Sequence, residues 1–549
     1  MSQVFDAVVV GSGAGGGASA WALTRKGLRV LVLEAGPRFD PDRDYKSATP
    51  AWEDGFPQKT GSQGEYAYAE MQALDARWKH LRSWNHIGGL LNPGDRRIAF
   101  GYHHVRGLGG SSLHFTGEAH RLHPKAMRLK SQFGVGADWP ISYEDLEPYY
   151  LQAEQVVGVA GSSADGLRPR SGPYPYAAHE ASHATRVLDK GFRQLGLKLV
   201  PNPLAVLPQA RDGRLSCNYC GTCLKGCPRR DKGSIDVTYL REAVATGRCE
   251  VRTGCTVTRV EAGAGEQVRG VHYRDSAGQH FVATPILVLA CGAIETPRLL
   301  LSSADARSPK GLCNESGQVG KNFMETLLWT SNALFPAPLA SHRGLPVDSI
   351  CWDYNAPDAI PGVVGGCRFS PSVAESDLLG PVNYARRVIK GWGRTHKRNM
   401  RRGFGRVLSV SGICESLPHP HSFVELDSLR KDSHGRPLAN IHSHVDEMAT
   451  RRIEFMAKQC RTILKACGAG EIFEEFSSYD IFSSTHVFGT CRMGRDPRQS
   501  VVDDMCRSHR WKNLYIVDAS VFPSTGGGES PGLTIQALAL RTFSAVIRK

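Results

Sequence analysis

The sequence lacks long runs of apolar residues. None reaches the ~18 residues that a membrane-spanning helix requires, and the N-terminus, MSQVFDAVVVGSG, has neither the basic region nor the cleavage site of a secretory signal. We therefore expect no transmembrane segment and predict a cytoplasmic protein.

Cysteines are too sparse for a disulfide scaffold, because only 15 occur among 549 residues. Internal repeats and low-complexity linkers are missing as well, so no boundary between independent units stands out. With 41% hydrophobic and 22% charged residues, the composition is that of a globular protein. The length suffices for two or more packed units.

Acidic residues are missing from one stretch. Residues 386–406 contain nine Lys and Arg and no Asp or Glu, so the remainder of the chain carries only +5 of the net charge of +14. Such a stretch can dock an acidic partner or an anionic membrane surface, and it is equally typical of a solvated helix and loop. Because no nucleic-acid-binding motif accompanies it, we predict no nucleic-acid partner.

The N-terminal region contains a dinucleotide-binding fingerprint. A β-branched run leads into Gly11, Gly13 and Gly16 in the pattern G-x-G-x-x-G, followed by a helical segment and a second strand that ends at Glu34. The glycines allow a tight turn and the close approach of a pyrophosphate to the helix N-terminus, and Glu34 can accept a hydrogen bond from a ribose hydroxyl. This βαβ pattern predicts a Rossmann-like domain.

Four cysteines occur within residues 217–228, CNYCGTCLKGCP. The spacing C-x2-C-x2-C-x3-C-P is that of bacterial ferredoxins, in which the fourth cysteine ligates a different cluster. Thiolates are soft ligands that suit iron. We predict an iron–sulfur cluster, either 3Fe–4S on three cysteines or 4Fe–4S completed by another ligand or by the fourth cysteine; the residues are Cys217, Cys220, Cys223 and Cys227. A structural zinc site or a pair of disulfides is the alternative.

Several other segments carry a family resemblance. They are RGLGGSSLHFTGEAHRLHP (106–124), DWPISYEDLEPYYLQAEQVVGVAG (138–161), VLACGAIETPRLLLSS (288–303), VGKNFME (319–325), HVFGTCRMGRDPRQSVVD (486–503) and NLYIVDASVFPSTGGGESPGLTIQALALRT (513–542). With them the chain resembles the glucose-methanol-choline (GMC) oxidoreductases, which are FAD flavoproteins, over nearly its whole length. Within the family, the sequence is most similar to the branch of gluconate, fructose and glucoside dehydrogenases, and it is also similar to pyranose oxidase. Those enzymes act on sugars or sugar acids.

The resemblance implies an α/β fold with an α+β second domain. A Rossmann-like FAD-binding domain is expected from residues 1–130, 231–325 and 478–549, the last segment carrying the active site. Residues 131–230 are expected to connect them, with a helix and the cysteine cluster, and residues 326–477 to form a substrate-binding domain on an antiparallel sheet. Local patterns agree, since residues 421–445 alternate like hairpins and residues 143–158 have helical spacing after Ser142.

The resemblance also implies catalytic residues. In the family a hydride passes from an alcohol carbon to flavin N5 while a base takes the hydroxyl proton. His486 begins H-x-x-G-T, where the family keeps its active-site histidine. The second residue, His or Asn, usually precedes the proline of N-P-x-x-T, but here that stretch is ESPGLT and the position holds Ser530. A serine hydroxyl can orient a substrate but is a poor base, and Glu529 beside it is a candidate to compensate.

His114 raises the question of covalent flavin attachment. It stands where pyranose oxidase and choline oxidase bond a histidine to the flavin 8α carbon, and the alternative is a histidine that packs against the ring. Thr116 then falls near flavin N5. The complete set of residues expected to bind FAD is Gly11, Gly13, Gly16, Glu34, Gly109, Gly110, Ser112, His114, Thr116, Val257, Asp518, Ala519 and Pro531.

Together these features predict an FAD-dependent dehydrogenase that oxidises the CH–OH group of a sugar, sugar acid, polyol or other alcohol. Electrons are expected to leave through the iron–sulfur cluster to an external acceptor, for which a small subunit or a cytochrome is the predicted partner. The alternatives are an oxidase that produces hydrogen peroxide and a non-redox lyase. Since relatives in the gluconate branch can be exported with a signal-bearing small subunit, a periplasmic location is the second expectation.

Overall fold

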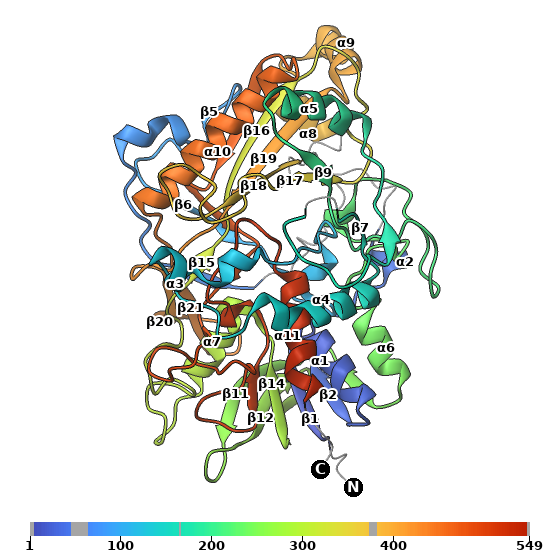
Figure 1. Ribbon diagram of the computed structural model, residues 1–549. Helices are drawn as coiled ribbons and strands as arrows, with labels where there is room; N and C mark the ends of the chain where they lie inside the picture. Colours follow the sequence, from blue (N-terminus) through green and yellow to red (C-terminus); the bar gives the residue numbers. More distant parts are fainter. Residues whose placement is uncertain (1–4, 46–63, 164–165, 373–380, 546–549) are drawn as a thin grey trace.

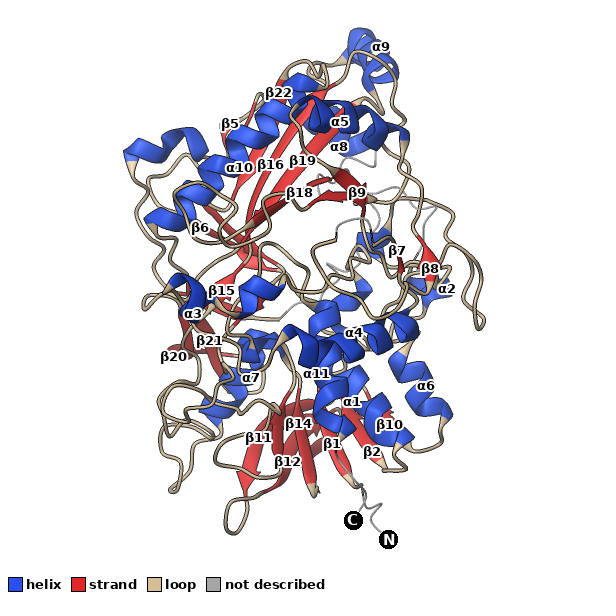
Figure 2. Ribbon diagram, viewed as in Figure 1, coloured by secondary structure: helices blue, strands red, loops and turns tan. Residues whose placement is uncertain are grey.

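The computed structural model describes residues 5–45, 64–163, 166–372 and 381–545. Two large sheets lie at opposite ends of the molecule, with helices packed on both (Figures 1 and 2). One sheet is parallel and has five strands, and the other is antiparallel and has eight. This arrangement confirms the predicted combination of a Rossmann-like domain with a second domain on an antiparallel sheet.

The parallel sheet joins segments that are distant in sequence. Its order is β10-β2-β1-β14-β25, and β1 and β2 are buried along their whole length, as expected for a parallel sheet covered on both faces. The strands are β1 (Ala7–Val10), β2 (Val30–Leu33), β10 (Cys249–Arg252), β14 (Ile286–Leu289) and β25 (Leu514–Ile516). The Rossmann-like domain is thus assembled from separated parts of the chain.

Helices α1 (Ala14–Arg25) and α11 (Gly532–Ser544) pack against each other, and α4 (Tyr143–Val157) packs on α11. Helix α4 begins after Ser142, as the spacing predicted. The Asp145 amide donates to Ser142 Oγ at 3.2 Å, and the Ser142 amide donates to the Asp145 carboxylate at 2.8 Å. This reciprocal pair is a capping box, which satisfies two amides that a helix start leaves free.

The antiparallel sheet has the order β5-β4-β22-β16-β19-β18-β17-β9. Helix α10 (Glu447–Ala466) packs on β16 and β19, and α5 (His183–Gln194) packs beside α10. The strands are β4 (Trp84–Asn85), β5 (Gly89–Leu90), β9 (Leu199–Pro201), β16 (Leu327–Leu334), β17 (Ser349–Cys351), β18 (Cys367–Pro371), β19 (Val407–Cys414) and β22 (Ile472–Ser477). Three strands therefore come from outside residues 326–477, and the predicted division of the chain into segments stays a prediction.

Smaller sheets complete the fold. Strands β20 (Phe423–Lys431) and β21 (Pro437–His442) form the antiparallel pair that the alternating pattern predicted, and β3 (Tyr66–Tyr68) joins β21 in parallel. Strands β11 (Thr256–Ala262), β12 (Val268–Asp275) and β13 (Gly278–Ala283) form a meander beside α7 (Gly292–Ser302).

The remaining elements are short. They are α2 (Pro41–Asp44), β6 (Ile98–Tyr102), α3 (Leu129–Phe133), β7 (Ala160–Gly161), β8 (Tyr176–Ala177), α6 (Tyr239–Ala245), β15 (Met324–Glu325), α8 (Pro381–Arg387), α9 (Gly393–Gly403), β23 (Ile481–Ser484) and β24 (Val487–Phe488). Within the described ranges, no helix has both the length and the apolar character needed to cross a bilayer.

Candidate active site

A cavity of about 680 Å³ lies between the two large sheets, because strand residues of both line it. Three helices, α1, α7 and α11, begin at its wall, through Gly13, Gly292 and Gly532. A helix N-terminus presents free amides and a partial positive charge. The cavity therefore favours the binding of a ligand with phosphate or other anionic groups.

Two glycine-rich turns form one side of the cavity. Gly11 has a φ of +91°, and a Cβ there would lie 2.5 Å from the carbonyl oxygen of Ala290. Gly110, with a φ of +58°, belongs to the second turn, and its Cβ would lie 2.9 Å from Gly13 Cα. The two turns, which are about a hundred residues apart in the sequence, are thus in direct contact, and a side chain at Gly110 would separate them.

Glu34 closes the end of the cavity beside β2. Its Oε2 accepts hydrogen bonds from the amide (3.1 Å) and hydroxyl (2.5 Å) of Ser12, and its Oε1 accepts from the Gly36 amide at 2.8 Å. The Ser12 hydroxyl oxygen accepts in turn from the Gly109 amide at 3.0 Å. Burial raises the pKa of Glu34. A carboxylate held here has acceptor capacity left for a ribose hydroxyl.

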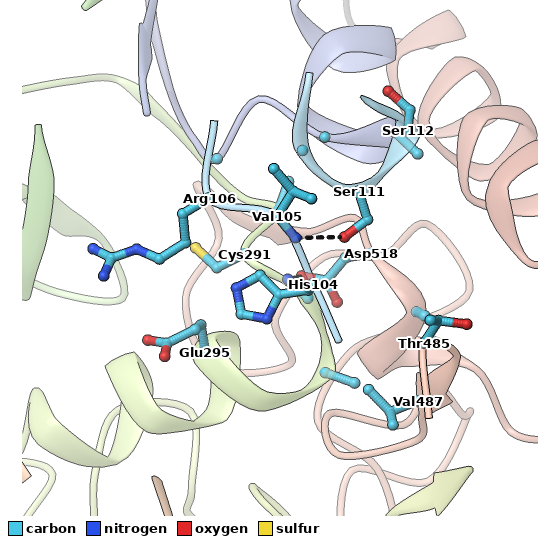
Figure 3. A pocket seen from close by; sticks show the side chains of 18 of the residues that line it. His104, Val105, Arg106, Ser111, Ser112, Cys291, Glu295, Thr485, Val487 and Asp518 are labelled. Atoms are coloured by element: carbon cyan, nitrogen blue, oxygen red, sulfur yellow. Dashed lines mark hydrogen bonds between the residues drawn. The ribbon is translucent and has the colours of Figure 1, made fainter. Parts of the chain in front are cut away.

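Asp518 fixes the start of α7. Its Oδ2 accepts from the Gly292 amide at 2.9 Å and from Thr296 Oγ1 at 2.6 Å. Figure 3 shows Asp518 near Cys291 and His104, with the hydrogen bond from the Val105 amide to Ser111 Oγ (3.3 Å) above them. Burial raises the pKa of Asp518. This carboxylate therefore holds β25 and α7 together at the cavity wall.

The sequence-predicted cofactor residues are gathered in one place. Most of them line the cavity: Gly11, Gly13, Glu34, Gly110, Ser112, His114, Thr116, Val257, Asp518, Ala519 and Pro531. Gly16 and Gly109 are not lining residues. A Cβ on Gly16 would lie 1.9 Å from the Gly11 carbonyl oxygen, and Gly109 has a φ of +107°, so both serve the close packing of the turns.

His486 and Ser530 line the same cavity from the loop between β23 and β24 and from the start of α11. The His486 backbone is fixed, since its amide donates to Ser484 Oγ at 3.2 Å and its carbonyl accepts from the Thr326 amide at 3.1 Å. Burial lowers the pKa of His486 to about 4, with Arg368 lowering it further and Glu118 opposing. The imidazole is therefore neutral at pH 7 and able to accept a proton.

Ser530 belongs to a buried network that sequence reasoning missed. Its hydroxyl donates to Glu118 Oε2 at 2.9 Å, and its amide donates to His120 Nδ1 at 3.0 Å. Arg368 Nη2 donates to the same Glu118 oxygen at 2.9 Å, and Asn202 Nδ2 donates to Oε1 at 3.1 Å. Burial raises the pKa of Glu118, but Arg368, His120 and these hydrogen bonds outweigh it and lower the pKa to about 2.

Glu529 is not the carboxylate that accompanies Ser530. It accepts from the His123 amide at 3.0 Å and from Arg168 Nη2 at 2.9 Å, and it does not line the cavity. Glu118, which follows the His114 loop, occupies that place instead. The acidic residue in GEAHRL, just after the His114 loop, could have been noticed in the sequence. Its partner Arg368, however, lies 250 residues away.

Comparison with known proteins agrees with this geometry. Residues 102–327 and 418–539 match the GMC oxidoreductase family, and residues 9–39 match an NAD(P)-binding Rossmann-like domain. The fructose dehydrogenase large subunit of Gluconobacter japonicus is 27% identical over 99% of this chain and 97% of its own. The 6'''-hydroxyparomomycin C oxidase of Streptomyces lividus is 31% identical over 99% of this chain and 91% of its own.

The chain belongs to the GMC oxidoreductase family. It is accordingly an FAD-dependent oxidoreductase that acts on CH–OH groups. The crystal structure of pyridoxine 4-oxidase from Mesorbium loti superposes with a TM-score of 0.61 at 20% identity, covering 98% of both chains. The described part of the chain therefore shares the fold of that enzyme.

The cavity of this GMC protein fits FAD by the chemistry of its walls. The crowded turn at Gly11 would hold the pyrophosphate at the start of α1, and the buried carboxylate of Glu34 would hold the ribose. His114, His486 and Ser530 line the part of the cavity that remains for the flavin and the substrate.

His114 stands in a loop that is fixed from behind. Lys232 is buried, and its Nζ donates to the carbonyls of Leu113 (2.9 Å), Phe115 (3.0 Å) and Cys223 (2.7 Å). Burial lowers the pKa of His114 to about 3, and the nearby Lys232 lowers it further. The imidazole is thus neutral, the backbone on either side of it is held in place, and the same lysine links this loop to the cysteine loop.

The four cysteines of this GMC chain do not form a closed ligand set. Cys217 Sγ accepts from the Tyr219 amide at 3.4 Å, Cys220 Sγ lies 3.0 Å from Thr222 Oγ1, and Cys227 Sγ donates to Asp231 Oδ1 at 3.3 Å. In the part of the chain that the structure describes, no three Cys, His, Asp or Glu side chains converge on a metal position, and no disulfide is formed. The prediction of an iron–sulfur cluster gains no support from this geometry.

The neutral state of His486 predicts an unusual pH dependence. If His486 takes the substrate proton, protonation of its imidazole blocks that step, so flavin reduction should fall as the pH drops through the pKa of His486. Because burial and Arg368 lower that pKa from 6.5 to about 4, the acid limb of the reduction rate should lie well below pH 6.5. Stopped-flow reduction of the enzyme-bound flavin across pH 4–8 measures it. An acid limb at or above pH 6.5 would contradict the assignment.

Proposed function

We propose that this protein is an FAD-dependent dehydrogenase that oxidises the CH–OH group of a small sugar, sugar acid, polyol or related alcohol to a carbonyl. The observation that carries the proposal is the position of His486 and Ser530, which line the cavity that also contains the glycine cradle and Glu34. FAD, when bound, supplies the acceptor for the hydride that leaves the substrate carbon.

The side chains of this chain handle the proton and the position of the substrate. As the hydride leaves, a ring nitrogen of neutral His486 takes the hydroxyl proton, which completes the two-electron oxidation of the alcohol. Ser530 orients a substrate oxygen beside it. Leu328 and Ile413, from the antiparallel sheet, contribute apolar walls that exclude water from the reacting groups.

Replacement of the base tests the proposal. His486→Ala should retain FAD and slow flavin reduction by an alcohol substrate on the order of a hundredfold or more, the usual scale for the loss of a positioned base. His280→Ala, at a partly exposed histidine on β13 that does not line the cavity, serves as the control. Anaerobic bleaching of the flavin absorbance gives both rates. Near-normal reduction in the His486 variant would remove this residue from the mechanism.

The oxidase and lyase alternatives differ in product. An oxidase would produce hydrogen peroxide in a 1:1 ratio with the carbonyl product in air, and a lyase would bind FAD without being bleached by any alcohol. The similar proteins bear names of both redox types, fructose dehydrogenase and 6'''-hydroxyparomomycin C oxidase. We favour the dehydrogenase because the cysteine loop lies beside the His114 loop.

We propose further that the flavin is bonded covalently to His114. The support is the neutral imidazole on the cavity wall and the two hydrogen bonds by which Lys232 holds the carbonyls of Leu113 and Phe115 on either side of it. After acid precipitation the yellow colour should stay with the polypeptide, and in His114→Ala it should pass to the supernatant. His104→Ala, at another lining histidine, should keep the colour on the chain. Free flavin from the unaltered protein would exclude the bond.

The electron exit is proposed at the cysteine loop, with a 3Fe–4S or 4Fe–4S cluster on its thiolates. The support is the cysteine spacing and the location: Leu224 lines the flavin cavity, and Lys232 joins the Cys223 carbonyl to the His114 loop. The thiols of Cys217, Cys220 and Cys227 would have to leave their present hydrogen bonds to bind iron.

Cys220→Ser should then lower the iron content while flavin reduction by substrate survives in a single turnover. Reoxidation by a one-electron acceptor such as cytochrome c should fall sharply, and Cys249→Ser, on β10, should change neither rate. Metal analysis of the parent protein accompanies the kinetics. Zinc in place of iron, no metal at all, or equal slowing of both half-reactions would contradict the proposal.

The basic stretch around Trp392 is a candidate contact surface for the predicted small subunit. Five exposed cations of α9 are Arg394, Lys397, Arg398, Arg401 and Arg402, and the Trp392 side chain beside them is 89% exposed. Figure 1 shows α9 at the end of the molecule opposite the parallel sheet. A partner that docks there would be bound to the protein without receiving electrons directly from the flavin. The partner and the cellular location both stay predictions.

A further inference from the structure

The hydroxyl of Ser530 has no hydrogen left for a substrate. A serine hydroxyl carries one donor hydrogen and two acceptor lone pairs, and here the hydrogen is donated to Glu118 Oε2 at 2.9 Å. Both residues line the cavity. A His or Asn at this position has N–H groups that can point at a substrate oxygen, whereas Ser530 as it stands can only accept.

Glu118 cannot supply a hydrogen either, because it is held as a carboxylate from behind the cavity wall. Arg368, 1% exposed, donates Nη2 to Glu118, Nε to the Gly528 carbonyl at 2.8 Å and Nη1 to Ser370 Oγ at 2.9 Å. Arg368 itself does not line the cavity. The pKa of about 2 agrees with this geometry and leaves Glu118 ionised at neutral pH.

The groups behind this pair are occupied as well. His120 accepts from the Ser530 amide at Nδ1 and contacts Asn202 Oδ1 through Nε2 at 2.8 Å, so both ring nitrogens are engaged. Asn202 Nδ2 donates to Glu118 Oε1 and to the Val347 carbonyl at 2.9 Å. Ser530, His120 and Asn202 therefore have no donor hydrogen free to turn toward a substrate, and Arg368 does not line the cavity.

The reacting hydroxyl has a single hydrogen, and the base His486 must receive it. The same hydrogen cannot also be donated to the acceptor oxygens of Ser530 and Glu118. On the basis of the proposed function, we propose that Ser530 and Glu118 form a specificity-determining acceptor pair that binds a second hydroxyl of the substrate. The pair selects diols, polyols and sugars over monohydric alcohols, and the charge of Glu118 disfavours sugar acids.

The reason for the selectivity is the cost of buried acceptors left without a donor. A site built to hydrogen-bond a substrate hydroxyl rejects analogues that lack it far more strongly than an apolar pocket rejects a missing methylene. A methyl ether at the second position is the sharpest analogue, because it keeps the oxygen and removes only the donor hydrogen.

The test uses the full-length FAD-loaded enzyme and three alcohols that share a secondary CH–OH group: 1,2-propanediol, 1-methoxy-2-propanol and 2-propanol. Sorbitol and gluconate extend the set to a polyol and a sugar acid. Anaerobic bleaching of the flavin gives the second-order rate constant for each. We expect the diol to exceed the ether and the monohydric alcohol by roughly a hundredfold or more, and sorbitol to exceed gluconate.

Variants separate recognition from chemistry. Ser530→Ala should bring the diol-to-ether ratio below about tenfold, and Ser530→Thr, which keeps the hydroxyl, should preserve it. His486→Ala should slow all three alcohols alike and leave the ratio unchanged. Glu118→Gln should also reduce the ratio, but because it removes the counter-charge of buried Arg368 and can unfold the protein, Ser530→Ala is the decisive variant.

The outcomes distinguish this inference from the function on which it rests. Equal bleaching by the diol, the ether and 2-propanol, or a ratio that Ser530→Ala leaves intact, would overturn the acceptor pair and leave the dehydrogenase standing. If none of these alcohols bleached the flavin, both would fall. A preference for gluconate over sorbitol would overturn the assigned substrate class alone.

Discussion

The contact between the two glycine-rich turns is the constraint on which the rest of the site depends. Gly110 approaches Gly13 so closely that a Cβ would lie 2.9 Å from its Cα, and the Ser12 hydroxyl links the second turn to Glu34. The second turn leads directly into the loop that carries His114 and then Glu118. Because the turns meet, the cradle at the start of α1 and the catalytic end of the cavity belong to one rigid wall.

The buried pair of Arg368 and Glu118 joins the two domains at the place where chemistry is expected. Arg368 lies on β18 of the antiparallel sheet, whereas Glu118 follows the glycine turn of the FAD-binding domain. A buried ion pair is weak evidence for stability, since desolvation offsets much of its attraction. Its effect here is local. Arg368 keeps Glu118 ionised, and the Glu118 carboxylate accepts the hydrogen of the Ser530 hydroxyl. Both charges of the pair also act on the pKa of His486.

Local patterns allowed much of the fold and part of the site to be predicted. The βαβ fingerprint, the capped start of α4 and the β20–β21 hairpin depend on interactions between near neighbours, so their signals are short and readable. His486 and Ser530 were found through their motifs. The cysteine spacing, by contrast, predicted a metal site, but three of the four thiols make hydrogen-bond contacts within their own loop. Spacing does not determine which way side chains of an irregular loop turn.

The sequence by itself determined the family, the FAD cradle and the two residues expected at the reaction centre, because each depends on residues that lie close together in the chain. Only the tertiary structure decided which carboxylate accompanies Ser530. Glu529 is its neighbour in sequence, yet that side chain turns to Arg168, and Glu118 takes the place through a hydrogen bond that spans 412 residues. Pairing between distant buried polar groups follows from how the two domains pack, and no local pattern records that packing.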